Sequence, residues 1–338
     1  MLKVIYISIL CGLLFSLPIS AQENISSVEK LRSFIQKDYF TLNLLIQSEG
    51  RFSFKDDNFQ GGRTFSTPNA RISIKGKFDG GLFYRFYINA ASEPNLLDAY
   101  IGYKFNDAFS LSAGSMKPKQ TLDYIPSPDA HKFVDRTTMT GLLVGSREIG
   151  ISATGEMSGF YYYTGLFNGN RLRTNNNNKF YLIGRLQYTV DDLIPGTVQF
   201  AVSASTGDSE GTVSGSTGPL LSGKRTIIGS DIELEYERLY LAAEYLRGEL
   251  ETYYSTGGNE IISGYYLTGG LHLSDKIMTL ARWQLWSYKE FGTTEKKLTL
   301  GTNIDFTTIA GIVLNIDAYI PDQGNTKYGA SFILQIVY

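Results

Sequence analysis

A single stretch of the sequence, residues 117–146, gathers basic side chains among prolines and aspartates. Four basic residues lie within it and a fifth follows directly: Lys117, Lys119, Lys132, Arg136 and Arg147. Cationic side chains beside an aqueous path lower the energy of a passing anion, and weak contacts let it leave again. Connections of this length without structure of their own usually have a function or pack against the fold. We therefore predict that these side chains attract anions; the alternative is a solvated loop that selects nothing.

A second pair of residues has the spacing of a hydrolytic site. His272 and Ser274 are two positions apart, so on a strand the imidazole and the hydroxyl would share one face, as in barrel lipid hydrolases. The pair falls at a predicted periplasmic turn, however, and no third residue completes it. Because the chain has one cysteine, Cys11, and two histidines, no zinc site can be assembled. We predict no catalysis, no cofactor and no metal, with a lipid hydrolase as the less favoured alternative.

The N-terminus has the pattern of an export signal. Lys3 is followed by an apolar run over residues 4–17 and then by a segment that ends in Ala21, which predicts a signal peptide over residues 1–21. The polar residues 22–36 are predicted as a periplasmic lead-in, and residues 37–338 as the folded region. The formal net charge of the chain is −2, so no excess of positive charge points to nucleic acid as a partner.

Alternation of polarity with a period of two runs through residues 37–338 and predicts β-strands. In residues 82–89 the two faces are Leu82, Tyr84, Phe86 and Ile88 against Arg85, Tyr87 and Asn89. A lysine or arginine that faces lipid at mid-membrane costs about 2–4 kcal/mol. The basic face of such strands is therefore predicted to line an aqueous interior. This places five cations on the wall of a solute path, Arg147 and four further residues: Arg71, Lys75, Arg85 and Arg185.

The connections between the predicted strands are alternately short and long. Residues 79–80 and 106–107 are short turns and residues 191–196 are the longest of the inner turns, whereas residues 55–68, 117–146 and 207–223 are long. About sixteen such strands predict an all-β fold, a transmembrane antiparallel barrel with short periplasmic turns, long outer loops and an interior too wide for side chains to fill. We expect the third long loop, residues 117–146, to fold inward as a constriction. A soluble sandwich would expose too large an aromatic band.

Five short motifs follow one another in order over residues 97–170. They are Leu97-Asp98-Ala99-Tyr100-Ile101-Gly102-Tyr103, Gly114-Ser115-Met116-Lys117-Pro118, Asp135-Arg136, Arg147-Glu148-Ile149-Gly150 and Tyr163-Thr164-Gly165-Leu166-Phe167-Asn168-Gly169. With this order and spacing the chain resembles the phosphate-selective porin O and P family. The resemblance implies a sixteen-stranded trimeric channel in which anions such as phosphate pass a ladder of arginines and a lysine-rich site. The chain departs from the usual motifs at Ser115, where Gln is usual, and at Asp135, where Glu is usual.

Pattern and resemblance together predict a bacterial outer-membrane porin for passive diffusion of small hydrophilic solutes, with a preference for anions such as phosphate. The expected partners are outer-membrane lipid, the solute and further copies of the chain in a homotrimer. The Gly- and Ser-rich residues 207–223 leave an adhesin or scaffold barrel without transport as an alternative.

Overall fold

The part of the chain that the structure describes forms one continuous sheet of seventeen strands. The structure is a computed structural model, and it describes residues 36–55, 62–93, 95–174, 177–254 and 259–338. The predicted signal peptide, residues 1–21, and all but the last residue of the predicted lead-in lie outside the described residues. The two-residue strand β1 (Gln36–Lys37) pairs with the start of β2.

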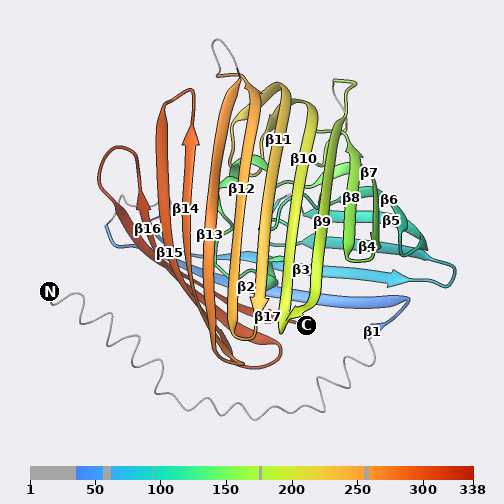
Figure 1. Ribbon diagram of the computed structural model, residues 1–338, viewed down its shortest axis with the longest axis horizontal. Coiled ribbons are helices and arrows are strands. Elements are labelled where there is room, and N and C mark those ends of the chain that lie inside the picture. Colours follow the sequence, from blue (N-terminus) through green and yellow to red (C-terminus); the bar gives the residue numbers. More distant parts are fainter. Residues whose placement is uncertain (1–35, 56–61, 94, 175–176, 255–258) are drawn as a thin grey trace.

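The other sixteen strands close into an antiparallel ring, because β17 pairs with β2. In Figure 1, β10 to β13 stand in front, and β2 and β3 of the back wall cross behind them. The strands are β2 (Phe40–Ser53), β3 (Arg63–Lys77), β4 (Leu82–Asn89), β5 (Leu96–Asn106), β6 (Phe109–Met116), β7 (Glu148–Met157), β8 (Phe160–Phe167), β9 (Tyr181–Ile194), β10 (Gly196–Val213), β11 (Leu220–Tyr236), β12 (Leu239–Thr252), β13 (Glu260–Ser274), β14 (Ile277–Tyr288), β15 (Thr293–Asp305), β16 (Ala310–Ile320) and β17 (Lys327–Val337). The predicted sixteen-stranded barrel is confirmed.

Each strand separates two environments through the alternation of its side chains. In β12, Leu241 and Tyr245 are each 42% exposed on the outer surface, whereas the intervening Ala242 and Glu244 are buried inside the ring. The same outer face carries Leu267 of β13 and Leu300 of β15, which are 53% and 50% exposed. A continuous apolar outer belt around a more polar interior is the arrangement that a membrane imposes on a barrel.

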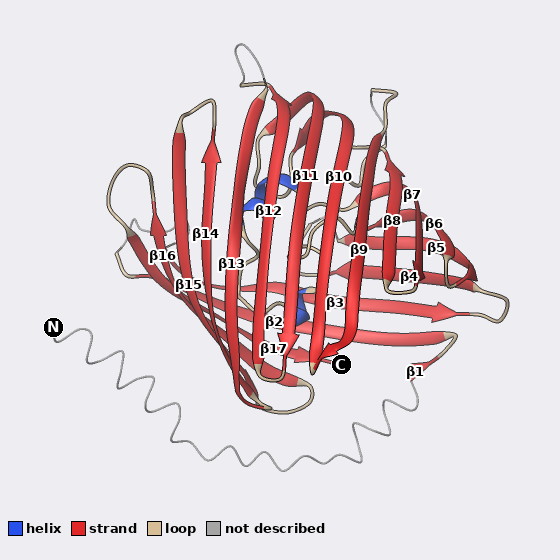
Figure 2. Cartoon of the chain, viewed as in Figure 1, coloured by secondary structure: helices blue, strands red, loops and turns tan. Residues whose placement is uncertain are grey.

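The connection between β6 and β7, residues 117–147, lies inside the ring. It contains the 3-10 turn η1 (Pro128–Ala130) and the short helix α3 (Thr138–Leu143), and both lie within the circle of strands in Figure 2. The Thr137 side chain caps α3 by accepting a hydrogen bond from the Thr140 amide, which satisfies one of the free N–H groups of the first turn. No helix among the described residues is long and apolar enough to cross a membrane.

Hydrogen bonds fix this segment, which we call the internal loop, to opposite walls of the barrel. Gln120 donates to Ser205 of β10 at 2.8 Å, and the Leu122 amide donates to Glu244 of β12 at 3.0 Å. On the opposite wall, Gln335 of β17 donates to the Asp129 carbonyl at 3.2 Å. The prediction that residues 117–146 fold inward is therefore confirmed.

The interior is not polar throughout, in contrast to the simple alternation that the sequence suggests. Met139, Leu142 and Leu143 of the internal loop pack against inward side chains of β11 to β14, among them Leu246 and Trp286. These wall positions are apolar because a buried helix covers them, whereas a solvated wall would leave them in water. The loop and this wall therefore fill part of the lumen toward the end that carries the long connections.

Two predicted connections differ from those observed. Residues 207–223 were predicted as a long loop, yet β10 and β11 extend through most of them, and Asp208 pairs with Lys224 in the ladder. Residues 191–196 were predicted as the longest inner turn, yet only Pro195 separates β9 from β10. Gly and Ser weaken the strand signal in the sequence, while ladder hydrogen bonds to a neighbouring strand satisfy the backbone regardless of side chain.

Candidate functional site

A cavity of about 460 Å³ lies between the internal loop and the inner wall formed by β3 to β8. We call it the basic cavity, because seven of its described lining residues are lysine or arginine and one, Asp98, carries a carboxylate. The cations are Arg71, Lys77, Arg85, Lys104, Lys117, Lys119 and Arg147. Strand parity places the wall cations here, since residues two apart on a strand share a face.

Three of these arginines converge on one aromatic ring. The guanidinium carbons of Arg71, Arg85 and Arg147 lie 5.5, 4.7 and 5.7 Å from the centroid of the Tyr87 ring. Register explains the grouping, because Asn89 beside Tyr87 on β4 pairs with Arg71 of β3. Aromatic faces attract cations within about 6 Å of the ring centroid, so Tyr87 holds like charges close together.

The carboxylate of Asp98 is shared by two members of this group. Arg147 donates from Nε to Asp98 Oδ1 at 2.7 Å, and Arg85 Nε lies 3.5 Å from Asp98 Oδ2. Asp98 is only 3% exposed and pairs with Tyr87 across β4 and β5. One negative charge therefore faces three positive charges, and the group keeps an excess of positive charge that can attract an anion.

Lys117 stands where the chain leaves β6 and enters the internal loop. Its Nζ donates to the carbonyls of Ile125 and Pro126 at 3.2 and 2.7 Å and lies 4.5 Å from the centroid of the Tyr124 ring. Burial lowers the pKa of the Lys117 ammonium well below its ordinary value, and the nearby guanidiniums of Arg136 and Arg147 lower that pKa further. Backbone carbonyls thus hold the ammonium in place without neutralising it.

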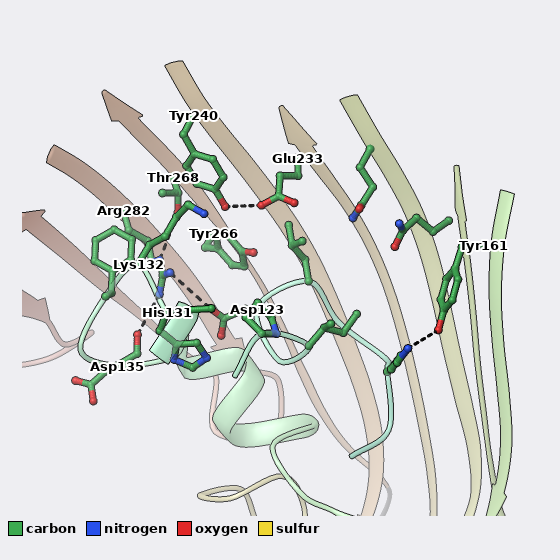
Figure 3. A pocket seen from close by; sticks show the side chains of 18 residues that line it. Asp123, His131, Lys132, Asp135, Tyr161, Glu233, Tyr240, Tyr266, Thr268 and Arg282 are labelled. Carbon is green, nitrogen blue, oxygen red and sulfur yellow. Dashed lines mark hydrogen bonds and ion pairs between the residues drawn. The ribbon is translucent and has the colours of Figure 1, made fainter. Parts of the chain in front are cut away.

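A second cavity, of about 320 Å³, lies on the other side of the internal loop against β8 to β14, and Figure 3 shows it. Its lining is mixed in charge: Lys132 lies 4.1 Å from the Tyr240 ring, and Tyr240 in turn donates to Glu233 at 2.8 Å. Lys119 lines both cavities and donates to the Tyr161 hydroxyl at 3.0 Å. We call this space the mixed cavity; Lys119 stands at its boundary with the basic cavity.

The structure therefore brings together five of the nine predicted solute-path residues and separates the others. Arg71, Arg85, Lys117, Lys119 and Arg147 line the basic cavity, whereas Lys132 lines the mixed cavity. The remaining three, Lys75, Arg136 and Arg185, line neither. Lys75 is exposed on β3.

The other two cations outside both cavities hold structure together. Arg136 binds the carbonyls of Asp123 and Pro126, the second at 2.8 Å, and so braces the internal loop. Arg185 is 3% exposed and binds both carboxylate oxygens of Asp231, at 2.5 and 2.8 Å. A guanidinium whose donors are committed in this way has little left to offer a passing solute.

Sequence reasoning did not single out Tyr87, Asp98 or Arg282. Arg282 of β14 lies 3.5 Å from the Asp123 carboxylate and 4.0 Å from the Phe133 ring, and donates to the Asp135 carbonyl at 3.3 Å. Alternation with the outward Trp283 and Leu285 places Arg282 on the inner face. The sequence did not show this clearly, because the inward neighbours Leu280 and Trp286 are also apolar and blur the alternation.

The predicted His272 and Ser274 pair lies at the short turn between β13 and β14. Ser274 Oγ accepts a hydrogen bond from the Lys276 amide at 3.3 Å, and a ladder irregularity falls between His272 and Ser274. His272 lines a small cavity together with His131, and Ser274 is not among its lining residues.

Comparison with known proteins gives one family and several similar folds. The sequence profile of the phosphate-selective porin O and P family matches residues 40–284. The structure is similar to an anion-selective porin from Comamonas acidovorans, with a TM-score of 0.67 at 13% identity over 88% of this chain and 99% of that one. OmpT of Vibrio cholerae matches with a TM-score of 0.65 at 12% identity, over 90% and 99%. OprB of Pseudomonas putida matches with a TM-score of 0.65 at 9% identity, over 92% and 97%. No curated protein matches the sequence significantly.

Proposed function

The chain belongs to the phosphate-selective porin O and P family and is an outer-membrane porin. From this premise we propose that it conducts small hydrophilic solutes passively and favours anions such as phosphate. The observation that supports the preference is the lining of the basic cavity, with seven cationic residues and one carboxylate. We propose that the solute passes the cations of that lining and also Lys132, which lines the mixed cavity. No reaction is part of this proposal.

The arginines around Tyr87 suit this role because the single carboxylate of Asp98 cannot neutralise all three. Arg71 donates to Asn69 at 2.6 Å and to the Tyr87 hydroxyl at 3.3 Å, which are both uncharged partners. A guanidinium keeps several donors in a fixed fork that fits carboxylate or phosphate oxygens. An anion in the basic cavity would therefore exchange part of its hydration shell for donors already in place, and several moderate contacts allow release.

Reversal potentials in a planar bilayer under a potassium chloride gradient test the preference. The wild-type channel is expected to be anion-selective, and Arg71→Gln together with Arg85→Gln should move the reversal potential toward the cation limit. Lys224→Gln serves as the matched control, because Lys224 is exposed at the end of β11 and lines neither cavity. A cation-selective wild type, or a double variant indistinguishable from the control, would refute the proposal.

We also propose that three copies associate through the wall formed by β4 to β8. Three of the five strands of this wall, β4, β6 and β8, have eight residues each, and β5 and β7 have 11 and 10, whereas β9 to β13 have between 14 and 18. A strand needs roughly 9–11 residues to cross the hydrocarbon layer, so the short wall fits contact with another protein surface better than contact with lipid. Its outer face carries Phe86 and Ile101, which are 43% and 64% exposed.

Light scattering of the detergent-solubilised protein tests this association. Ile101→Arg should convert trimers into monomers, because the charge would be buried between copies. Val202→Arg is the matched control, since Val202 is 57% exposed on β10, outside the wall formed by β4 to β8. A monomeric wild type, or equal dissociation by both variants, would contradict the proposed interface.

A further inference from the structure

A row of polar side chains crosses the outer surface of the barrel near the extracellular ends of β12 to β15. Arg247 pairs with Ser263, Ser263 with Ser287, and Ser287 with Thr294. All four therefore stand side by side in one row across the strands, on the face directed away from the lumen. The hydroxyls of Ser287 and Thr294 are 2.9 Å apart.

The rows beneath this one become apolar toward the middle of the membrane. The next row consists of Tyr245, Tyr265, Leu285 and Lys296. The row after that consists of Ala243, Leu267, Trp283 and Leu298. Aromatic side chains of barrels gather where hydrocarbon meets headgroups, so the polar row lies at the height of the headgroups of the outer leaflet.

A groove of about 500 Å³ follows this polar row, and we call it the rim groove. Its lining includes all four residues of the row, with Tyr245 below and Lys289 above. The small hydroxyl side chains leave space between the two cations, Arg247 and Lys289. The Lys289 amide donates to the Ile261 carbonyl at 3.0 Å, which fixes its backbone at the edge of the groove.

The two cations of the rim groove have no ion-pair partner among the residues that the structure describes. The nearest carboxylate along β12, that of Glu249, instead accepts a hydrogen bond from Asn259 at 3.0 Å. Two basic groups and three hydroxyls around one groove form a set of donors that suits a phosphate group. Because the groove lies on the lipid-facing surface and not in the lumen, its ligand must come from the membrane side.

We propose that the rim groove binds the phosphorylated headgroup of an outer-leaflet lipid. Arg247 and Lys289 pair with the phosphate, and Ser263, Ser287 and Thr294 donate to its remaining oxygens. The acyl chains of the same lipid lie along the apolar rows beneath, beginning with Tyr245 and Tyr265. This site is separate from the solute path, so neither proposal depends on the other.

Native mass spectrometry of the detergent-solubilised porin with added lipid tests the site. The wild type is expected to retain phosphatidic acid, which carries a phosphomonoester headgroup, and to lose phosphatidylcholine under the same activation. The double variant Arg247→Ser with Lys289→Ser should retain at least ten-fold less phosphatidic acid than the wild type. The control Lys224→Ser removes an exposed cation of neighbouring β11 outside the groove and should retain the lipid.

Two further measurements separate the possible outcomes. Channel conductance of the double variant should equal that of the wild type, which shows that the barrel is folded. Inorganic phosphate in excess should leave the bound phosphatidic acid in place; complete displacement would mean a site for soluble anions and would overturn the lipid assignment. Equal retention of both lipids, or retention by the folded double variant, would overturn it as well.

Discussion

Tyr87 gives the arginines of the basic cavity a common platform, and Asp98 limits their repulsion. The three guanidinium carbons lie within 5.7 Å of the Tyr87 ring centroid, and two of the arginines share the Asp98 carboxylate. The group is thus assembled before a solute arrives. Pre-organised donors cost little reorganisation when an anion enters, which favours rapid passage over tight binding.

The first prediction concerns Asp98→Asn, which removes the carboxylate of the basic cavity and keeps its size. We expect the reversal potential to move further toward the anion limit, because the excess of positive charge grows. Loss of the partner of Arg85 and Arg147 should lower the free energy of unfolding by about 1–3 kcal/mol, measured by urea unfolding in vesicles. The exposed Asp322→Asn serves as control. An unchanged reversal potential would place the solute path outside the basic cavity.

The second prediction concerns pH and Lys117. Burial lowers the pKa of this lysine, so it loses its positive charge at a lower pH than an exposed lysine. Anion selectivity should therefore be fully present below that lowered pKa and should decline as the pH rises through it. Reversal potentials over a pH series measure the decline. Lys117→Gln should abolish the pH-dependent component; the same decline in that variant would assign it to another group.

For single residues, the alternation along each strand predicted which face a side chain occupies better than it predicted the residues that the side chain contacts. Arg71 and Arg85 could be placed on the inner wall because a period of two fixes the face, whereas Arg147, predicted on the wall, is the last residue of the internal loop. The role of Arg185 could not be predicted, since its partner Asp231 lies 46 positions away in the sequence. Arg136 likewise binds loop carbonyls, and no pattern in the sequence specifies the turns that present them.

Among the elements, the internal loop depends on a few buried anchors. Glu244 accepts hydrogen bonds from the amides of Leu122 and Asp123 at 3.0 and 3.4 Å, and Arg282 lies against Asp123, Asp135 and Phe133. On the other side of the bore, Gln335 of β17 donates to the Asp129 carbonyl at 3.2 Å. The loop therefore has contacts on each side, and its position sets the boundary between the basic and mixed cavities.

The third prediction concerns the anchor Arg282. Arg282→Met keeps the apolar contact with Phe133 but leaves the buried Asp123 carboxylate without this partner, a change that typically costs about 3–5 kcal/mol for a buried pair. We expect the internal loop to loosen, so single-channel currents should become noisier and larger on average. Lys224→Met is the control for loss of a cation. Steady currents of wild-type size would show that Arg282 does not hold the loop.

For the elements, the sequence predicted strands well where one face is charged and less well where loop residues cover the wall. Alternation located β3, β4 and β5 because basic and apolar positions are distinct. On β13 and β14 the inward side chains Ile262, Leu280 and Trp286 are apolar as well, which blurs the period. The inward position of the loop was predicted from its length, but the contacts that hold it join residues more than 70 positions apart.

Across the whole molecule, positive charge remains mainly on the wall formed by β3 to β7. Several acidic side chains of the facing strands are locally compensated, as Asp231 is by Arg185 and Asp317 is by Lys297 at 3.1 Å. The arginines around Tyr87 share a single carboxylate instead. The excess of positive charge along one wall therefore depends on which strands pair in the closed ring and which charged side chains they bring together. The net charge of the sequence does not reveal it.

The fourth prediction tests the closure on which this arrangement depends. Leu334 of β17 and Ser48 of β2 are direct ladder partners on the outer face, so cysteines at both positions should form a disulfide within the range of about 4.4–6.8 Å between Cα atoms that such bonds require. In a Cys11→Ser background, the oxidised double variant Leu334→Cys with Ser48→Cys should migrate faster on a denaturing gel than the same chain after reduction. Leu334→Cys with Leu44→Cys is the control, because a shift of four residues along β2 moves the partner by about 13 Å. Cross-linking in the control but not in the designed pair would mean that the ring closes in another register.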